Sequence, residues 1–169
     1  MAFMFSVGDY VVYGGNGVCL VESIGTPACA CNVKTDYYFL SPVSYAGRIY
    51  APVDTHVPMR AILTRDEALT LLRDMPSIPS CVNLSRDKRQ LSEHYKQLLS
   101  PHTCYALVTA VKSIREKSGL DRRHPVTQTE EDILKRSRAA LVQELALALE
   151  VDEEQAEHML LDALREKTM

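Results

Sequence analysis

Cys104 and its neighbouring histidines are the residues whose types could perform nucleophilic chemistry. His102 lies two positions before Cys104 and His124 lies further along the chain, and an imidazole can act as general base for a thiol. Such dyads are defined by geometry, however, and a cysteine within Cys-Tyr-Ala-Leu-Val is typical of a helix core. A cysteine-dependent enzyme is therefore a weak hypothesis, and we expect no enzyme and no catalytic residue.

The five cysteines favour neither a disulfide framework nor a metal site. Their number is odd and no CxxC pair occurs, which fits a reducing compartment. Cys29 and Cys31 are close in sequence, but a metal or redox site needs further ligands, and the nearest histidine along the chain is His56. We interpret the two residues as incidental thiols in a loop, and we expect no metal and no cofactor.

The run Gly-Gly-Asn-Gly at residues 14–17 superficially resembles a phosphate-binding loop. No Lys-Ser or Lys-Thr pair follows it, so the phosphate-loop interpretation is weak. Asn-Gly instead supplies the positive φ angles of a tight hairpin turn. The sequence therefore predicts a turn between two strands here.

The net charge of −3 conceals an uneven distribution along the chain. Residues 1–75 hold 5 Lys/Arg and 7 Asp/Glu, residues 76–140 hold 12 and 7, and residues 141–169 hold 2 and 8. A local positive field favours nucleic acid even in an acidic chain, because phosphate attraction depends on nearby charges. The alternative is a solvated helix face of mixed charge, and charge alone does not separate the two.

The first part of the chain has the composition of short β-strands. Residues rich in β-branched and aromatic side chains occur at 7–13, 18–24, 37–40 and 48–53, and Gly47 marks a turn before the last of them. So small a sheet is expected to curl into an SH3-like or Tudor-like barrel, whose rim or edge strand is a common docking surface for proteins.

The periodicity becomes helical after Leu63. Helices are predicted from Thr64 to about residue 75 and at about 85–99, 101–117, 129–150 and 153–167. The start signals are side chains able to cap a free backbone N–H, and they are Thr64 with Glu67, Ser85, Ser100, Thr127 or Thr129, and Asp152 with Gln155. Gly119 is expected to end the third helix in the left-handed conformation.

Connectors are predicted at residues 53–63 and 76–83, so the chain divides into a β domain, 1–60, and a helical domain, 61–169. The fold class is therefore α+β. Leu134, Leu141, Leu145 and Leu149 form a stripe that is expected to be core. No stretch is apolar enough to cross a membrane and no signal peptide is evident at the N-terminus, so we expect a cytoplasmic protein with no membrane partner.

The order of these pieces resembles the CarD and CdnL family of bacterial transcription regulators. Residues 5–13 (FSVGDYVVY) and 18–24 (VCLVESI) are similar to the opening of that family, and residues 48–54 (RIYAPVD) to its late barrel strand. Residues 144–149 (ELALAL) resemble its long C-terminal helix, so the similarity covers roughly residues 3–165. Each motif alone is unspecific, and their order and the chain length carry the resemblance.

The resemblance implies a non-catalytic regulator that alters the stability of the open promoter complex. Its Tudor-like domain would bind the β subunit of RNA polymerase, and its helical domain would contact promoter DNA without sequence specificity, so the protein would be nucleoid-associated through the polymerase. By resemblance, Arg48, Tyr50 and Pro52 fall on the polymerase-docking strand. The DNA-binding residues implied in the same way are Arg86, Lys88, Arg89 and Arg136.

This chain departs from the family in having no tryptophan, the residue that commonly wedges against the DNA minor groove. The wedge position falls at about Asn83 or Leu84, and leucine can also act as a minor-groove wedge, with less stacking area. The alternative is that Leu84 packs inside the helical domain. A protein-binding adaptor of the same fold, with little or no DNA contact, is the second functional hypothesis.

Overall fold

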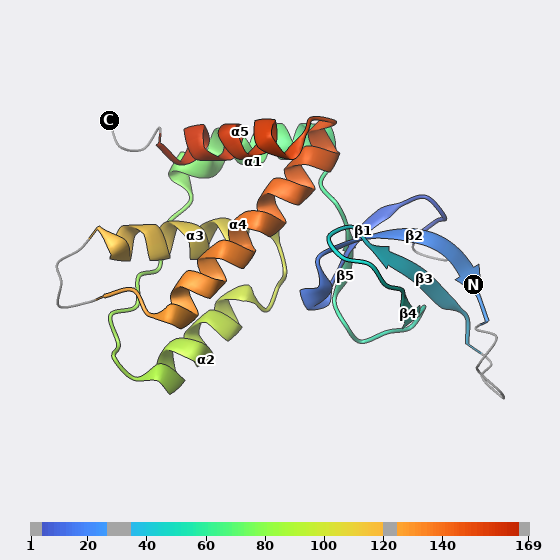
Figure 1. Cartoon of the computed structure of the whole chain (residues 1–169), viewed down its shortest axis with the longest axis horizontal. Helices are drawn as coiled ribbons and strands as arrows, with labels where there is room; N and C mark the ends of the chain where they lie inside the picture. The colour runs from blue at the N-terminus through green and yellow to red at the C-terminus, as the bar shows by residue number, and fades with distance from the viewer. Residues whose placement is uncertain (1–4, 27–34, 120–124, 166–169) are drawn as a thin grey trace. The chain divides into compact units, whose positions relative to one another are not determined.

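The structure is a computed structural model that describes residues 5–26, 35–119 and 125–165. The chain divides into two compact units, Met1–Ile62 and Leu63–Met169, here called the β unit and the helical unit (Figure 1). The α+β class, with a small β domain before a helical one, is confirmed. Cys29, Cys31 and His124 lie outside the described residues.

The β unit is a five-stranded antiparallel sheet. Its strands are β1 (Tyr10–Tyr13), β2 (Val18–Gly25), β3 (Tyr37–Pro42), β4 (Ile49–Pro52) and β5 (Met59–Ala61), in the spatial order β4-β3-β2-β1-β5. Strand β5 corrects the prediction of a connector over residues 53–63. Met59–Ala61 is a run of only three residues, too short for an alternation of apolar and polar side chains to predict a strand. These residues form one because they pair antiparallel with β1.

Alternation along the strands builds the core of the β unit. Successive residues of a strand point to opposite faces, and Val11, Val21, Leu40 and Ala51 are each completely buried in one cluster. Tyr38 belongs to this cluster, and its ring packs edge to face on that of Phe5, with 5.9 Å between the ring centroids. One face of the sheet is therefore apolar and packed.

The turn between β1 and β2 differs from the predicted Asn-Gly hairpin. Gly14–Asn16 form a short 3₁₀ turn, and the positive φ angles are 49° at Gly14 and 76° at Gly17, with none at Asn16. A Cβ placed on Gly14 would lie 2.8 Å from Cγ1 of Val57. Gly14 is therefore required both by its backbone conformation and by the close approach of Val57.

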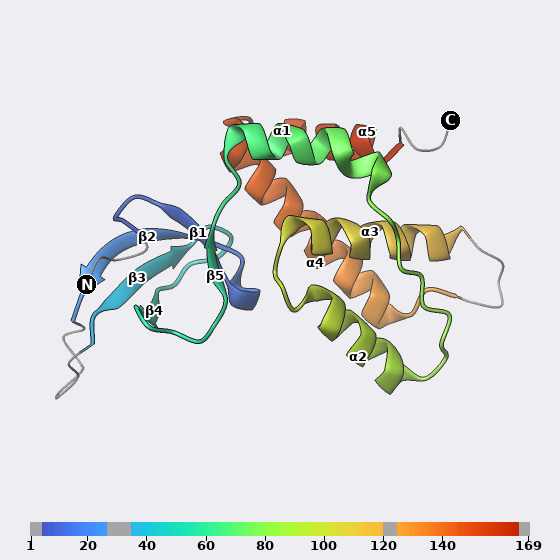
Figure 2. The same ribbon diagram turned by 180° about the vertical axis from the view of Figure 1, so that it is seen from behind.

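The helical unit contains α1 (Arg65–Asp74), α2 (Lys88–Leu99), α3 (Cys104–Ser118), α4 (Gln128–Leu149) and α5 (Glu153–Arg165). A 3₁₀ turn, Met75–Ser77, follows α1. Helix α1 runs beside α5, and α3 packs on α4 (Figure 2). The predicted stripe is confirmed, because Leu141, Leu145 and Leu149 are buried in the core and Leu134 packs against it.

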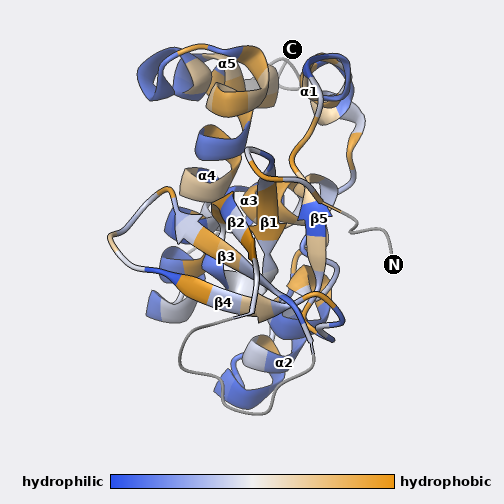
Figure 3. Ribbon diagram, turned by 90° about the vertical axis from the view of Figure 1, so that its right-hand side faces the viewer, coloured by the Kyte–Doolittle hydropathy of each residue, from blue (hydrophilic) through white to orange (hydrophobic). Residues whose placement is uncertain are grey.

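Helix α5 is amphipathic. Its exposed residues include Glu153, Glu154 and Asp162, whereas Ala156 and Leu160 are buried. Hydrophilic and hydrophobic residues lie on different sides of this helix in Figure 3. Among the described residues, no helix is long and apolar enough to cross a membrane.

Three of the predicted helix starts are confirmed and two are wrong. Thr64 accepts a hydrogen bond from the Glu67 N–H, Thr127 forms a capping box with Glu130, and Asp152 accepts from the Gln155 N–H at 2.7 Å. The caps of α2 and α3 are Asp87 and Thr103, and not Ser85 and Ser100. The Ser85 hydroxyl instead accepts from the Asp87 N–H before the helix and donates to the Gln90 side chain within it.

Gly119 ends α3 as predicted, but not for the predicted reason. Its φ and ψ are −87° and −5°, which lie in the right-handed region. The left-handed helix exit occurs after α4, at Glu150, where φ is 57° and the backbone N–H donates to the carbonyl of Ala146. A residue other than glycine thus takes the conformation that glycine usually supplies.

Candidate functional site

Strand β4 forms one edge of the sheet. Among the described residues it pairs with β3 alone, in a register that puts Phe39 opposite Tyr50. The N–H of Val53 donates to the carbonyl of Asp36 at 3.1 Å, which makes Val53 a hydrogen-bonded position. Because such positions alternate along an antiparallel pair, the backbone groups of Tyr50 point away from β3. Pro52 lies two residues further on, where its missing N–H interrupts no pairing with β3.

The three residues expected at the polymerase-docking strand share one face. Arg48, Tyr50 and Pro52 alternate with residues that pack into the core, namely Ile49, Ala51 and Val53. The Arg48 guanidinium lies 3.6 Å from the Glu22 carboxylate, and both side chains are well exposed. Tyr50 is 48% exposed, and its ring packs edge to face on that of Phe39, with 5.2 Å between the ring centroids. The face thus offers an aromatic ring, a cation and an open strand edge.

A connecting segment, residues 79–87, joins the turn after α1 to α2 and has no helix or strand of its own. Side chains of α3 hold its beginning. The Cys81 N–H donates to Ser113 Oγ at 2.7 Å, and the Ser80 hydroxyl donates to the Glu116 carboxylate. Lys112 Nζ donates to the carbonyls of Met75 at 2.9 Å, Pro76 at 3.2 Å and Ile78, just before the segment.

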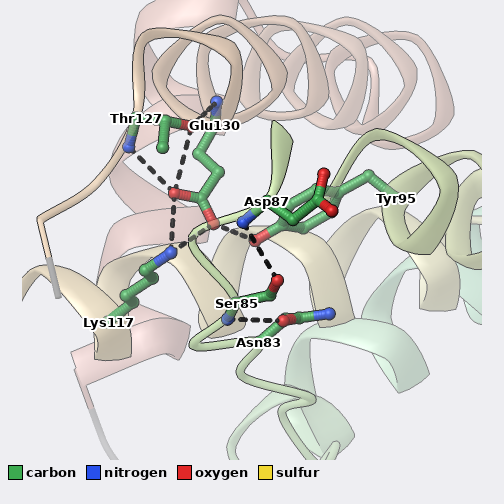
Figure 4. A network of polar contacts seen from close by, with 7 residues as sticks. All are labelled: Asn83, Ser85, Asp87, Tyr95, Lys117, Thr127 and Glu130. Carbon is green, nitrogen blue, oxygen red and sulfur yellow. Dashed lines mark hydrogen bonds and ion pairs between the residues drawn. The ribbon is translucent and has the colours of Figure 1, made fainter. Parts of the chain in front are cut away.

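The end of the connecting segment is fixed by a relay of short-range hydrogen bonds. The Ser85 N–H donates to the Asn83 side chain at 2.9 Å, and the Asp87 N–H donates to Ser85 Oγ at 3.2 Å (Figure 4). Asp87 in turn accepts from the N–H groups of Arg89 and Gln90 at the start of α2. Such side-chain turns order backbone that lies outside regular structure.

Leu84 lies between these anchored residues, and its side chain is 43% exposed. The alternative that Leu84 is enclosed in the helical core is therefore wrong. The helix begins only at Lys88, so Leu84 belongs to the segment before the helix and not to the helix mouth.

Four basic residues were expected to contact DNA, and all four are exposed. Arg86, Lys88 and Arg89 follow Leu84 within five residues and form one local group with it. Arg136 lies on α4, on the side of the helix away from the buried stripe. Asp87 sits within the local group, but its carboxylate already accepts backbone hydrogen bonds at the start of α2.

A buried polar network joins α2, α3 and the start of α4 (Figure 4). Lys117 Nζ of α3 lies 2.9 and 3.0 Å from the two oxygens of Glu130 on α4, and the Tyr95 hydroxyl of α2 donates to the same carboxylate at 2.8 Å. The Thr127 N–H completes the set at 2.9 Å. The carboxylate therefore fixes α2 and α3 against the start of α4.

The network shifts two pKa values. Burial by itself raises the pKa of Glu130, but the Thr127 N–H and the hydrogen bonds from Lys117 and Tyr95 outweigh it and hold that pKa below its ordinary value. Burial, together with the hydrogen bond to Glu130, raises the pKa of the Tyr95 hydroxyl. Glu130 is therefore charged and Tyr95 is neutral near pH 7.

Cys104 is buried in the core between the helices. It belongs to the same buried apolar cluster as Val108 and Ala146, in agreement with the interpretation of this stretch as helix core.

Sequence reasoning missed Ser113, Glu116, Tyr95, Lys117 and Glu130. A signal existed for Glu130, because it precedes Leu134 by four residues and so falls on the apolar stripe of α4. A carboxylate in such a stripe predicts a buried cationic partner. No comparable signal marks Ser113, whose role depends on a backbone N–H 32 residues away.

Comparison with known protein families covers both units. Residues 5–63 match the CarD-like/TRCF RID domain, and residues 107–161 match the CarD C-terminal domain. Comparison with curated proteins finds no match for the chain. The two domain matches occur in the order of the β and helical units and together cover more than half of the chain. The chain therefore belongs to the CarD-like family, a family of non-enzymatic transcription factors.

Proposed function

We propose that this protein is a transcription regulator that binds the β subunit of RNA polymerase through its β unit and promoter DNA through its helical unit. Bound in this way, it changes the stability of the open promoter complex. The observation that carries the DNA part of the proposal is the exposure of Leu84 directly beside Arg86, Lys88 and Arg89.

The polymerase contact is assigned to strand β4 and its outward face. An open strand edge can receive a strand of a partner, whose backbone would pair with the outward N–H and carbonyl of Tyr50. Tyrosine and arginine, like tryptophan, are enriched among the side chains that dominate binding energy at protein interfaces. Tyr50 and Arg48 supply these two types on one face, and Pro52 limits how far a partner strand can pair.

The DNA contact is assigned to the exposed group at residues 84–89, with Arg136 as a further phosphate contact. Cationic side chains attract the DNA backbone regardless of sequence. An apolar side chain can enter the minor groove at a distorted base step, and leucine is among the residues that do so. Because polymerase would position the protein on the promoter, the regulator needs no base-specific contacts of its own.

The test is the lifetime of the open complex, measured with purified polymerase and promoter DNA in the presence and absence of the full-length protein. The proposal expects a change in lifetime that saturates with protein concentration. Binding to polymerase with no change in lifetime, and no added protection of promoter DNA, would instead support an adaptor that binds protein alone.

A further inference from the structure

We infer that α3 positions Leu84 for DNA: Ser113 and Glu116 hold the beginning of the connecting segment so that Leu84 is presented in one conformation. The inference rests on the proposed contact between Leu84 and promoter DNA. It adds a function for two α3 residues that face the segment and that lie outside the group proposed to contact DNA.

The connecting segment depends on side chains for its shape. Residues 79–87 form neither helix nor strand, so no regular backbone ladder orders them. Pro79 restricts its own φ angle but donates no hydrogen bond. Without outside contacts, the residues around Leu84 would sample many conformations, and binding to DNA would have to order them at an entropic cost.

Helix α3 provides the outside contacts from residues on one side. Position 116 is four residues from 112 and three from 113, so the side chain of Glu116 neighbours those of both Lys112 and Ser113 on the helix surface. Lys112 Nζ donates to three backbone carbonyls that lie before residue 79. Within the segment, Ser113 accepts from the Cys81 N–H and Glu116 accepts from the Ser80 hydroxyl. Together these contacts hold the chain from Met75 to Cys81, which lies three residues before Leu84.

Ser113 is the residue best suited to test the inference. It is 1% exposed, and its hydroxyl accepts from the Cys81 N–H at 2.7 Å while donating to the Thr109 carbonyl at 2.6 Å. The hydrogen bond to Thr109 fixes the orientation of the hydroxyl, so its oxygen is placed to accept from the Cys81 N–H. Alanine at this position would leave the Cys81 N–H without that acceptor.

Leu84 therefore lies between two fixed points. Cys81 is held on α3, and Asp87 is held at the start of α2. Helix α2 is itself joined to α4 by the Tyr95–Glu130 hydrogen bond. Removal of the Cys81 contact should loosen the N-terminal end of this span, where only the Ser80–Glu116 hydrogen bond within the segment would remain, while the Asp87 cap keeps the other end in place.

The experiment compares full-length Ser113→Ala with Ser118→Ala. Ser118 is the matched control, because it lies on the same helix and its hydroxyl donates to the carbonyl of Arg115 in its own helix. Three quantities are measured for each variant: the exchange rate of the Cys81 amide, the melting temperature and the open-complex lifetime. Glu116→Ala, which alters an exposed side chain, is the second variant in case Ser113→Ala unfolds.

We expect Ser113→Ala to speed exchange of the Cys81 amide and to reduce the effect on open-complex lifetime by about 2- to 10-fold, the range that corresponds to one lost hydrogen bond. Ser118→Ala should change neither quantity. Glu116→Ala should act in the same direction as Ser113→Ala, with a nearly unchanged melting temperature.

Leu84→Ala distinguishes failure of this inference from failure of the proposed function. If Leu84→Ala reduces the effect on lifetime but Ser113→Ala and Glu116→Ala do not, α3 does not position Leu84 and the proposed DNA contact stands. If Leu84→Ala has no effect either, both the DNA contact and the inference are overturned. Unchanged exchange at Cys81 in folded Ser113→Ala would also overturn the inference.

Discussion

Lys117 on α3 and Glu130 on α4 form an ion pair that is almost completely removed from water. Their side chains are 3% and 0% exposed, and Lys117 Nζ lies 2.9 Å from the nearer oxygen of Glu130. Charges buried at this depth are retained only when their partners are present, because desolvation of a lone charge is costly. Tyr95 and Thr127 supply the remaining hydrogen bonds of the carboxylate.

Lys117→Met should therefore lower the free energy of unfolding by about 3–5 kcal/mol, since it leaves Glu130 buried without a countercharge. The double variant Lys117→Met, Glu130→Gln should recover part of that loss. Urea unfolding of the single and double variants measures the coupling. Arg73→Met is the control, because Arg73 and Asp74 form an exposed pair whose loss should cost less than about 1 kcal/mol. Additive losses in the double variant would refute coupling.

Glu130 should also make the stability of the helical unit sensitive to acid. Its pKa in the folded protein lies below its ordinary value, so the folded state binds fewer protons than the unfolded state. The stabilisation is then present above roughly pH 4.3, the usual glutamate pKa, and is lost as the pH falls through the folded pKa. Urea unfolding from pH 3 to pH 7 should show a shallower acid decline for Glu130→Gln than for the wild-type protein. Identical slopes would contradict this assignment.

The division into a β unit and a helical unit could be predicted because strands and helices leave different periodicities. Val11 and Val21 belong to runs of β-branched and aromatic residues, whereas Leu141, Leu145 and Leu149 recur every four residues. Strand β5 could not be predicted, since Met59, Arg60 and Ala61 acquire strand geometry by pairing with β1.

Local details of the candidate site required the structure. Ser85 and Asp87 are both suitable helix caps. The hydroxyl of Ser85 is engaged by the Asp87 N–H and the Gln90 side chain, so the cap lies two residues later than predicted. The anchoring of Cys81 on Ser113 joins residues that are distant in sequence, and no local pattern encodes it. The sequence left two alternatives for Leu84, an exposed wedge or a residue packed inside the helical domain, and the structure shows it exposed.

The edge-strand proposal predicts that Tyr50→Ala weakens binding to the polymerase β subunit by roughly 5- to 30-fold, the range for a residue worth 1–2 kcal/mol at an interface. Arg48→Glu should weaken it too, and loss of the exposed pair with Glu22 should cost little stability. Binding is measured by pull-down titration of the full-length variants.

Tyr105→Ala is the matched control for the edge strand, because Tyr105 is 50% exposed and lies in the helical unit. Folding of every variant is checked by circular dichroism. Unchanged β-subunit binding of folded Tyr50→Ala and Arg48→Glu would exclude this face of β4 as the docking surface.

The proposed phosphate contacts predict the salt dependence of DNA binding. If Arg86, Lys88 and Arg89 each neutralise a phosphate, replacement of each by glutamine should make the slope of log affinity against log salt shallower by about 0.9. Arg136→Gln should make this slope shallower by a further amount of about 0.9. The control is Lys96→Gln, which removes an exposed cation from the last turn of α2. Duplex binding measured from 50 to 200 mM salt gives the slopes. Equal slopes for the wild-type protein and for a variant with Arg86→Gln, Lys88→Gln and Arg89→Gln together would place DNA elsewhere.

Leu84 provides the sharpest test of DNA contact, because it is 43% exposed and belongs to none of the buried apolar clusters of the described residues. Leu84→Ala should change the free energy of unfolding by less than about 0.5 kcal/mol, as expected for a surface position. It should nevertheless reduce the effect of the protein on open-complex lifetime, while Leu84→Trp should increase that effect by adding stacking surface. Leu69→Ala is the matched control, since Leu69 on α1 is 44% exposed and lies outside the proposed DNA surface. Parallel effects of Leu84→Ala and Leu69→Ala would show that loss of exposed leucine, and not loss of a wedge, explains the change. A tryptophan at position 84 that leaves the lifetime unchanged, in a protein that still binds polymerase, would argue that this residue never reaches the DNA.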